Sequence, residues 1–161
     1  MTRFFFLTAI AASVDLLTKA IATSALRDGQ VIALTRRMAL MLVYNTGATG
    51  GASWGAFTGV LNIAATVGAI AMVIWIIKPL AVVDSRALLA LSLVTGGALG
   101  NLASMLAGPA GVADFFAVRL GDYAPIVMNV ADLLLWGGAI LLMPVIVTLV
   151  RAVRAGRALG S

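Results

Sequence analysis

Two aspartates are the residues of this sequence best suited to chemistry. Asp114 lies in Gly111-Val-Ala-Asp114-Phe-Phe, and Asp132 lies in Asn129-Val-Ala-Asp132. They belong to a chain of 161 residues with only six acidic side chains, all of them aspartate, and no histidine. Asp114 closes an uncharged run over 87–113, and Asp132 opens an apolar run over 133–150. An acid at each of two neighbouring membrane edges costs insertion free energy, which indicates a functional role.

A pair of carboxyl groups can hydrolyse a peptide without a metal or a nucleophilic side chain. Two carboxyl groups in one site of low dielectric cannot both ionise easily, so one keeps its proton. One acid can then deprotonate a water while the other protonates the scissile carbonyl or the leaving amine. The alternative for Asp132 is helix capping, since an acid in the first turn binds free N–H groups and favours the dipole. Capping leaves Asp114 unexplained.

The composition excludes most other classes of protein. The chain is 62% hydrophobic and 11% charged, whereas a soluble domain has about 25% charged residues. This indicates a small polytopic membrane protein of one domain, residues 1–161. With no cysteine, histidine or glutamate, we expect no metal and no cofactor. The net charge of +5 is scattered over loops and the C-terminus, so we expect no nucleic-acid partner and interpret the charge as a topology signal.

Four segments are long and apolar enough to cross about 30 Å of hydrocarbon. They cover approximately residues 4–22, 57–77, 87–105 and 130–150. The first is interpreted as a retained helix rather than a removed leader, because Asp15 and Lys19 interrupt its apolar body.

The lysines and arginines predict the orientation of these spans. More of them fall on the side of the two termini, so both termini are expected in the cytoplasm (N-in/C-in). The segment from Lys78 to Arg86 would be a short inner loop. Arg151, Arg154 and Arg157 would anchor the tail to anionic lipid.

The segment 23–56 is too long for a simple turn. Residues 31–44 are rich in Val, Ile, Leu and Met, which fits two short strands or one amphipathic piece. A glycine-rich turn follows from Asn45. We therefore predict an all-α membrane protein of four transmembrane helices with a small extracytoplasmic β-element at the bilayer surface.

Several polar residues accompany the two acids. Asp15 and Lys19 are four apart and can pair, either as the wall of a site or as a snorkelling lysine with its acid. Asn45 and Gly47 suit a site or a plain turn. The small residues of Gly96-Gly-Ala-Leu-Gly-Asn101 allow close helix packing, which leaves Asn101 to bond across helices or to orient a carboxylate.

The order of these blocks resembles the lipoprotein signal peptidase family, also called signal peptidase II. The blocks are Asp15-x-x-x-Lys19, Asn45-x-Gly47-Ala48, Gly96-Gly-Ala-Leu-Gly-Asn101, Gly111-Val-Ala-Asp114-Phe and Asn129-Val-Ala-Asp132. The resemblance implies an aspartic endopeptidase of the bacterial inner membrane with a periplasmic β-cradle. Its partners would be membrane phospholipids and its substrate, a diacylglyceryl-modified prolipoprotein whose signal peptide is cut before the lipid-bearing cysteine.

The resemblance also assigns roles to residues. Asp114 and Asp132 match the family's catalytic pair. The supporting positions that match are Asp15, Lys19, Asn45, Gly47, Asn101 and Asn129.

The sequence departs from the family in two motifs, and it has one extra residue between Asn101 and Asp114. The family follows its Gly-Asn with Leu-Ile-Asp-Arg, whereas Ser104 and Met105 stand at the last two of these positions. The family's Asn-x-Gly-Ala-Ala-Phe lacks its Phe here, where Gly50 stands instead. Met105 has no hydrogen-bond donor in its side chain and so cannot replace the N–H groups of an arginine guanidinium. The alternative function is therefore a catalytically impaired or inactive relative that acts as a binding or structural subunit of a membrane protein complex.

Overall fold

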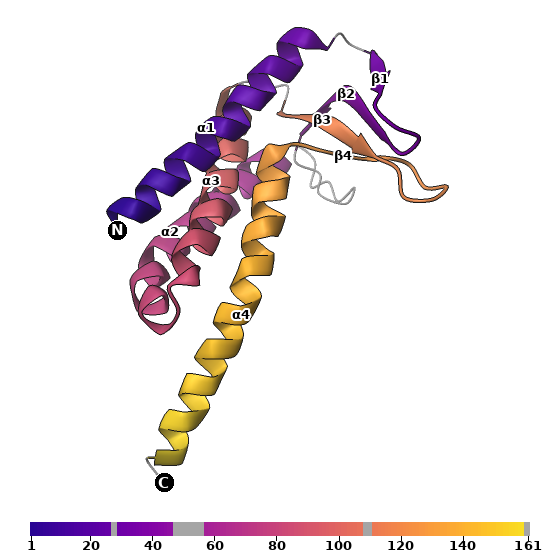
Figure 1. Cartoon of the computed structure of the whole chain (residues 1–161). Coiled ribbons are helices and arrows are strands. Elements are labelled where there is room, and N and C mark those ends of the chain that lie inside the picture. Colours follow the sequence, from indigo (N-terminus) through magenta and orange to yellow (C-terminus); the bar gives the residue numbers. More distant parts are fainter. Residues whose placement is uncertain (27–28, 47–56, 108–110, 160–161) are drawn as a thin grey trace.

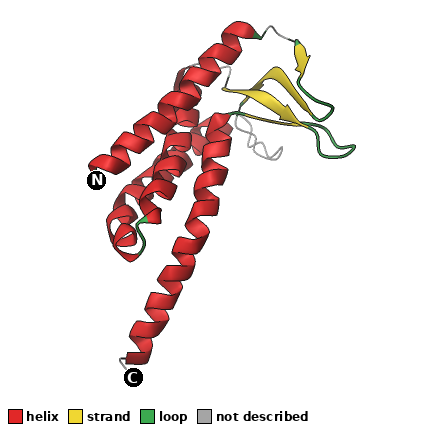
Figure 2. Cartoon of the chain, in the orientation of Figure 1, coloured by secondary structure: helices red, strands yellow, loops and turns green. Residues whose placement is uncertain are grey.

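The protein consists of four helices and one small sheet at an end of the helix bundle (Figures 1 and 2). The computed structural model describes residues 1–26, 29–46, 57–107 and 111–159, with side chains up to residue 155. The helices are α1 (Thr2–Ala25), α2 (Thr58–Val83), α3 (Arg86–Ala107) and α4 (Val130–Leu159). All four are long and apolar enough to span a membrane. The predicted fold class, four spans with a small β-element, is confirmed.

Helix α3 lies at the centre of the bundle and packs against the other three helices. Small residues on two of its faces make this possible. A side chain at Gly97 would lie 2.6 Å from the carbonyl oxygen of Ala131 in α4. On the α1 side, a side chain at Gly100 would lie 2.9 Å from the carboxyl carbon of Asp15. The glycines therefore bring polar groups of α1, α3 and α4 within hydrogen-bonding range.

The turn between α2 and α3 is shorter than the inner loop expected from Lys78 to Arg86. Helix α2 continues through Pro79 to Val83, since membrane-spanning helices tolerate an interior proline and the residues after it are apolar. Asp84 then accepts a bond from the Arg86 backbone N–H, 2.9 Å, and one from the Thr148 hydroxyl of α4, 3.3 Å. These bonds tie the turn to α4.

The sheet is antiparallel with strand order β1-β2-β3-β4. Its strands are β1 (Val31–Ala33), β2 (Met38–Asn45), β3 (Val112–Val118) and β4 (Ile126–Met128). The sequence placed the β-element in 23–56, which supplies only the first two strands. The other two come from the segment between α3 and α4, and Asp114 lies on β3 rather than at the end of a membrane span. Residues 87–113 carry no charge, so hydropathy gave no signal for a strand after the third span.

Both chain termini lie at the end of the bundle opposite the sheet, which extends sideways from the start of α4 (Figure 1). This arrangement follows from an even number of spans. The lysine and arginine distribution predicts that the end with the termini is cytoplasmic.

We predict that Gly97→Val destabilises the protein by about 1–3 kcal/mol, because the new side chain would collide with the backbone of α4. Gly68→Val is the matched control: its position lies in α2 with open space around it. Thermal unfolding in detergent measures both variants. Equal melting temperatures for the two variants would contradict the close packing of α3 on α4.

Candidate active site

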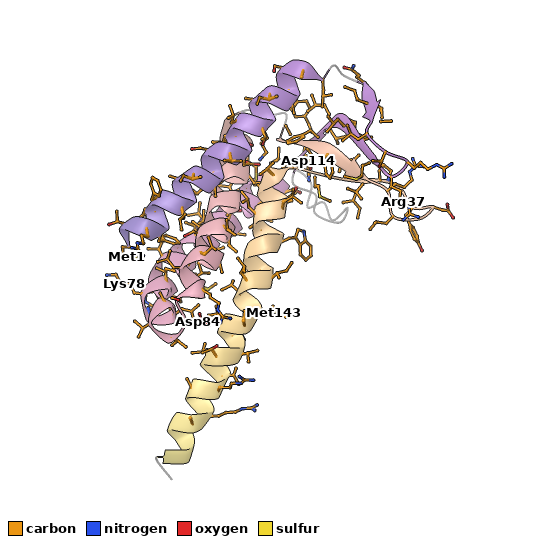
Figure 3. All side chains as sticks on the ribbon, in the orientation of Figure 1. Met1, Arg37, Lys78, Asp84, Asp114 and Met143 are labelled. Atoms are coloured by element: carbon orange, nitrogen blue, oxygen red, sulfur yellow. The ribbon has the colours of Figure 1, made fainter. Side chains whose placement is uncertain are left out.

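Asp114 and Asp132 line one cavity of about 220 Å³ at the junction of the sheet and the bundle. The sheet contributes Asp114 from β3, and α4 contributes Asp132 from its first turn. Figure 3 shows Asp114 where the sheet meets the start of α4. Three of the amide side chains that line the same cavity were predicted for the site: Asn45, Asn101 and Asn129. The structure thus brings together five of the predicted site residues from four separate parts of the chain.

Asn129 and Asp132 cap the start of α4 reciprocally. The Asn129 backbone N–H donates to Asp132 Oδ2 at 2.9 Å, and the Asp132 backbone N–H donates to Asn129 Oδ1 at 3.2 Å. This is the geometry of a capping box. Asp132 Oδ1 accepts a longer bond, 3.5 Å, from the Asn101 side chain. Capping and a place in the cavity, posed by the sequence as alternatives, are therefore both properties of Asp132.

Asp114 is almost fully buried, with 4% of its surface exposed. Its Oδ1 accepts a hydrogen bond from the Asn129 side-chain amide, and its Oδ2 accepts one from Asn45 at 3.3 Å. Burial raises the pKa of Asp114 above its ordinary value of 3.8, and the nearby Asp132 carboxylate adds to the rise. The two amide bonds oppose that rise, as does the charge of Lys19.

Lys19 connects the two acids to α1. Its ammonium group donates to Asp15 Oδ2 and to Asn101 Oδ1, both at 2.7 Å. Asp15 Oδ1 also accepts the backbone N–H of Ala131, 2.7 Å, at the start of α4. Lys19 is 5% exposed and Asp15 is fully buried. The predicted ion pair is present, and the alternative of a snorkelling lysine is wrong because Lys19 points into the bundle.

Asn101 joins these groups into one network. Its Oδ1 accepts from Lys19 and also from the Asn129 side-chain amide at 3.3 Å. Because both lone pairs of Oδ1 are used, the amide nitrogen of Asn101 is directed toward Asp132. Gly47, the remaining predicted site residue, lies outside the described residues.

Helix α2 adds cavity residues that the sequence reasoning missed. Asn62 and Thr66, one turn apart on α2, line the same cavity as the two acids. An amide inside an otherwise apolar span was the available signal. Met105 also lines this cavity, whereas the Ser104 hydroxyl bonds back to the Gly100 carbonyl of its own helix at 3.0 Å.

Among the described residues, no group of three or more acidic, histidine or cysteine side chains is placed to hold a metal ion. The chemistry that the cavity offers is that of two carboxyl groups and the amides around them.

Comparison with known proteins points to one family. The model of the signal peptidase (SPase) II family matches residues 7–148. A lipoprotein signal peptidase from Hydrogenovibrio crunogenus is 34% identical over 137 residues, which cover 80% of this chain and 76% of that protein.

Two solved structures, both described as bacterial membrane enzymes, share the fold. One, at 1.9 Å resolution, has a TM-score of 0.79 and covers 91% of this chain and 93% of its own. The other, at 2.3 Å, has a TM-score of 0.73 and covers 91% and 88%. Each is 21% identical to this chain.

The buried ion pair predicts a non-additive double-mutant cycle. Lys19→Met leaves the Asp15 carboxylate buried without its ion partner, which should destabilise the protein by about 3 kcal/mol. In Asp15→Asn/Lys19→Met the amide oxygen can still accept from Ala131 and no charge is buried, so the loss should be smaller. Denaturant unfolding in detergent measures the cycle. Additive losses in the two single variants would contradict the coupling.

The raised pKa of Asp114 predicts a pH-dependent loss of stability. Because the folded state holds this proton more tightly than the unfolded chain, folding loses stability as pH rises above about 4. Asp114→Asn does not titrate, so the melting temperature of the parent relative to this variant should fall as pH rises from about 4 to about 8. Melting curves over this range test this, and a difference that stays constant or moves in the parent's favour as pH rises would contradict it.

Proposed function

Because the chain belongs to the signal peptidase II family, we propose that it is an aspartic endopeptidase that removes signal peptides from diacylglyceryl-modified prolipoproteins. It is a multi-pass protein of the bacterial inner membrane. The observation that carries the proposal is the placing of two aspartates, Asp114 and Asp132, on one small cavity with Asn129 bonded to both.

The two acids divide the proton transfers. Burial raises the pKa of Asp114, which favours Asp114 as the partner that holds the shared proton. Asp132 takes a proton from the attacking water, and the resulting hydroxide adds to the scissile carbonyl carbon. Asp114 gives its proton to the carbonyl oxygen as the tetrahedral intermediate forms. Collapse of the intermediate releases the amine, which takes the proton that Asp132 gained, while a hydroxyl group of the intermediate returns a proton to Asp114 as the carboxyl product forms.

The amides keep the carboxyl groups in position during these transfers. Asn129 contacts both acids, and Asn101 links Asp132 to the buried ammonium of Lys19. Because the amides are themselves bonded within the network, they restrict the rotamers of the acids. Asp15, Lys19, Asn101 and Asn129 act as positioning residues, and Asn45 does so from the sheet side.

The position of the cavity, at the end of the bundle where the sheet joins it, suits the substrate. A prolipoprotein is cleaved directly before a cysteine that carries lipid, and its acyl chains stay in the bilayer, so the scissile bond lies at the membrane surface. The cavity lies where α4 begins and the sheet joins the bundle. A peptide approaching along the bilayer surface reaches Asp114 without leaving the interface.

The replacement of the family's Asp-Arg by Ser104 and Met105 is compatible with catalysis. Within the described part of the chain, the hydrogen bonds that the carboxyl groups of Asp114 and Asp132 accept come from amides, either of a side chain or of the backbone. The positions of the acids therefore do not depend on an arginine at 105. The matched family model and relative are peptidases, which does not favour the alternative of a non-catalytic subunit.

Cleavage of a diacylglyceryl-modified prolipoprotein by the purified protein in detergent tests the function. Asp114→Asn and Asp132→Asn should each lower kcat by about 10³-fold or more while the fold remains intact. Asp122→Asn is the matched control, since this aspartate is exposed on the loop between β3 and β4. It should cleave at the parent rate.

Two results would reject the proposal. One is an uncleaved substrate under conditions in which another family member cleaves it. The other is cleavage that survives in both Asp114→Asn and Asp132→Asn.

A further inference from the structure

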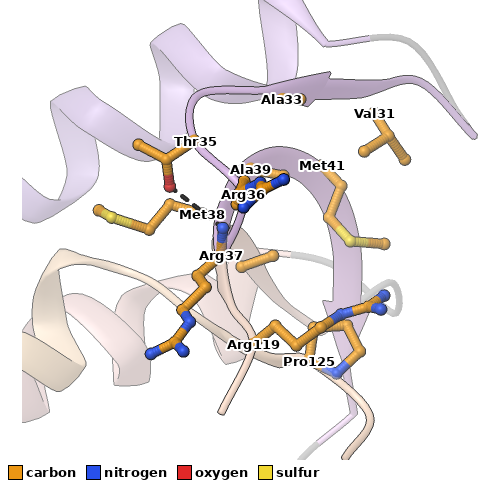
Figure 4. A pocket seen from close by; sticks show the side chains of 11 residues that line it. Val31, Ala33, Thr35, Arg36, Arg37, Met38, Ala39, Met41, Arg119 and Pro125 are labelled. Atoms are coloured by element: carbon orange, nitrogen blue, oxygen red, sulfur yellow. Dashed lines mark hydrogen bonds between the residues drawn. The ribbon is translucent and has the colours of Figure 1, made fainter. Parts of the chain in front are cut away.

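A second, larger cavity of about 470 Å³ lies on the sheet, apart from the two acids. Its floor contains a row of alanines in register across three strands, Ala33, Ala39 and Ala117. Val31 and Met41 form the next pair of the same two strands on this face of the sheet. Short side chains in one row flanked by longer ones leave a hollow in the sheet surface. Figure 4 shows this hollow, which we name the arginine groove.

Three arginines line the arginine groove, from two separate segments. Arg36 and Arg37 belong to the turn between β1 and β2, and Arg119 directly follows β3 (Figure 4). The Arg119 backbone N–H donates to the Arg37 carbonyl oxygen at 2.8 Å, and the Arg37 N–H donates to the Thr35 hydroxyl at 3.2 Å. These bonds hold the backbones of Arg37 and Arg119 side by side, and their side chains extend from there along different parts of the groove lining (Figure 4).

These arginines have no acidic partner in the part of the chain that the structure describes. The ion pairs there join Lys19 to Asp15 and Arg86 to Asp84. Three like charges on the lining of one groove repel one another, and an anion bound there would reduce that repulsion. The planar guanidinium group of an arginine can donate two parallel hydrogen bonds to one phosphate group.

The surroundings of the arginine groove are those of a membrane surface. The sheet extends sideways from the end of the bundle rather than along the helix axes (Figures 1 and 3). The far edge of the sheet, meaning the end that carries the β1–β2 and β3–β4 loops, therefore lies beyond the helices. Large apolar and aromatic side chains are exposed around that edge: Leu34, Leu120, Tyr123 and Ile126. Tyr123 is 81% exposed. Tyrosine and apolar residues beside arginines are typical of a surface that contacts lipid headgroups.

We propose that the arginine groove binds the headgroup phosphate of an anionic phospholipid on the side of the membrane where the sheet lies. The three arginines hold the phosphate, and the alanine floor accepts the apolar start of an acyl chain. This site shares no residue with the cavity of Asp114 and Asp132. Its occupancy fixes the far edge of the sheet to the bilayer, independently of the proposed peptide cleavage.

Binding of short-chain lipids to the full chain in uncharged detergent tests the proposal. The chain contains no cysteine, so Val31→Cys provides a unique attachment point for an environment-sensitive fluorophore at the edge of the groove. The probes are dihexanoyl phosphatidylglycerol, dihexanoyl phosphatidylcholine, inorganic phosphate and hexaglutamate. Phosphatidylglycerol should saturate the signal with a Kd at least about tenfold below that of each other probe.

Charge removal at the groove should abolish that preference. Arg36→Gln/Arg37→Gln/Arg119→Gln should raise the Kd for phosphatidylglycerol by about tenfold or more. Arg151→Gln/Arg154→Gln, which removes charge from the far end of α4, should leave it unchanged. If the triple variant is unstable, Arg119→Lys serves instead. It keeps the positive charge but loses the planar guanidinium group, so binding of phosphatidylglycerol should weaken several-fold.

Each other result overturns the lipid assignment. Equal affinity for phosphatidylglycerol and phosphatidylcholine means that the arginines do not select the headgroup. Equal affinity for inorganic phosphate means a free-anion site, and tighter binding of hexaglutamate means a site for an acidic polypeptide. Unchanged binding by both the triple variant and Arg119→Lys places the lipid elsewhere.

Discussion

The buried ammonium group of Lys19 is the interaction on which the rest of the site depends. A charge at this depth must be neutralised and hydrogen-bonded, because its desolvation costs several kcal/mol. Asp15 supplies the counter-charge and Asn101 the second acceptor. Each of these partners has another bond to make: Asp15 to the start of α4, and Asn101 to Asp132. Satisfying one lysine therefore fixes the relative positions of α1, α3 and α4.

Close packing makes that network possible. The carboxylate of Asp15 occupies the space that a side chain at residue 100 would fill, and the carbonyl of Ala131 does the same for residue 97. Larger residues at these glycines would separate the helices by more than a hydrogen bond can span. The polar network and the small residues are thus two parts of one requirement: bonds of about 3 Å need backbones that approach closely.

The sequence was sufficient for the features with a strong local signal. Hydropathy identified the four spans, helical spacing paired Asp15 with Lys19, and the order of blocks led to the two acids that line one cavity. It was insufficient where pairing is long-range. Strand β3 is joined to β2 across about seventy residues, Asn45 to Asp114, and no local pattern encodes that distance. Asn62 was missed for a related reason, since only the packed bundle shows which face of α2 meets the cavity.

The division of the sheet between two distant segments also sets an order of events during synthesis. Strands β1 and β2 leave the ribosome before α2, but β3 and β4 follow α3, and Asn129 and Asp132 come with α4. The cavity therefore does not exist until the last span has been made and inserted. A nascent chain that has not yet inserted α4 lacks the paired acids, so its hydrolytic capacity, under the proposed function, begins only after this span is in the membrane.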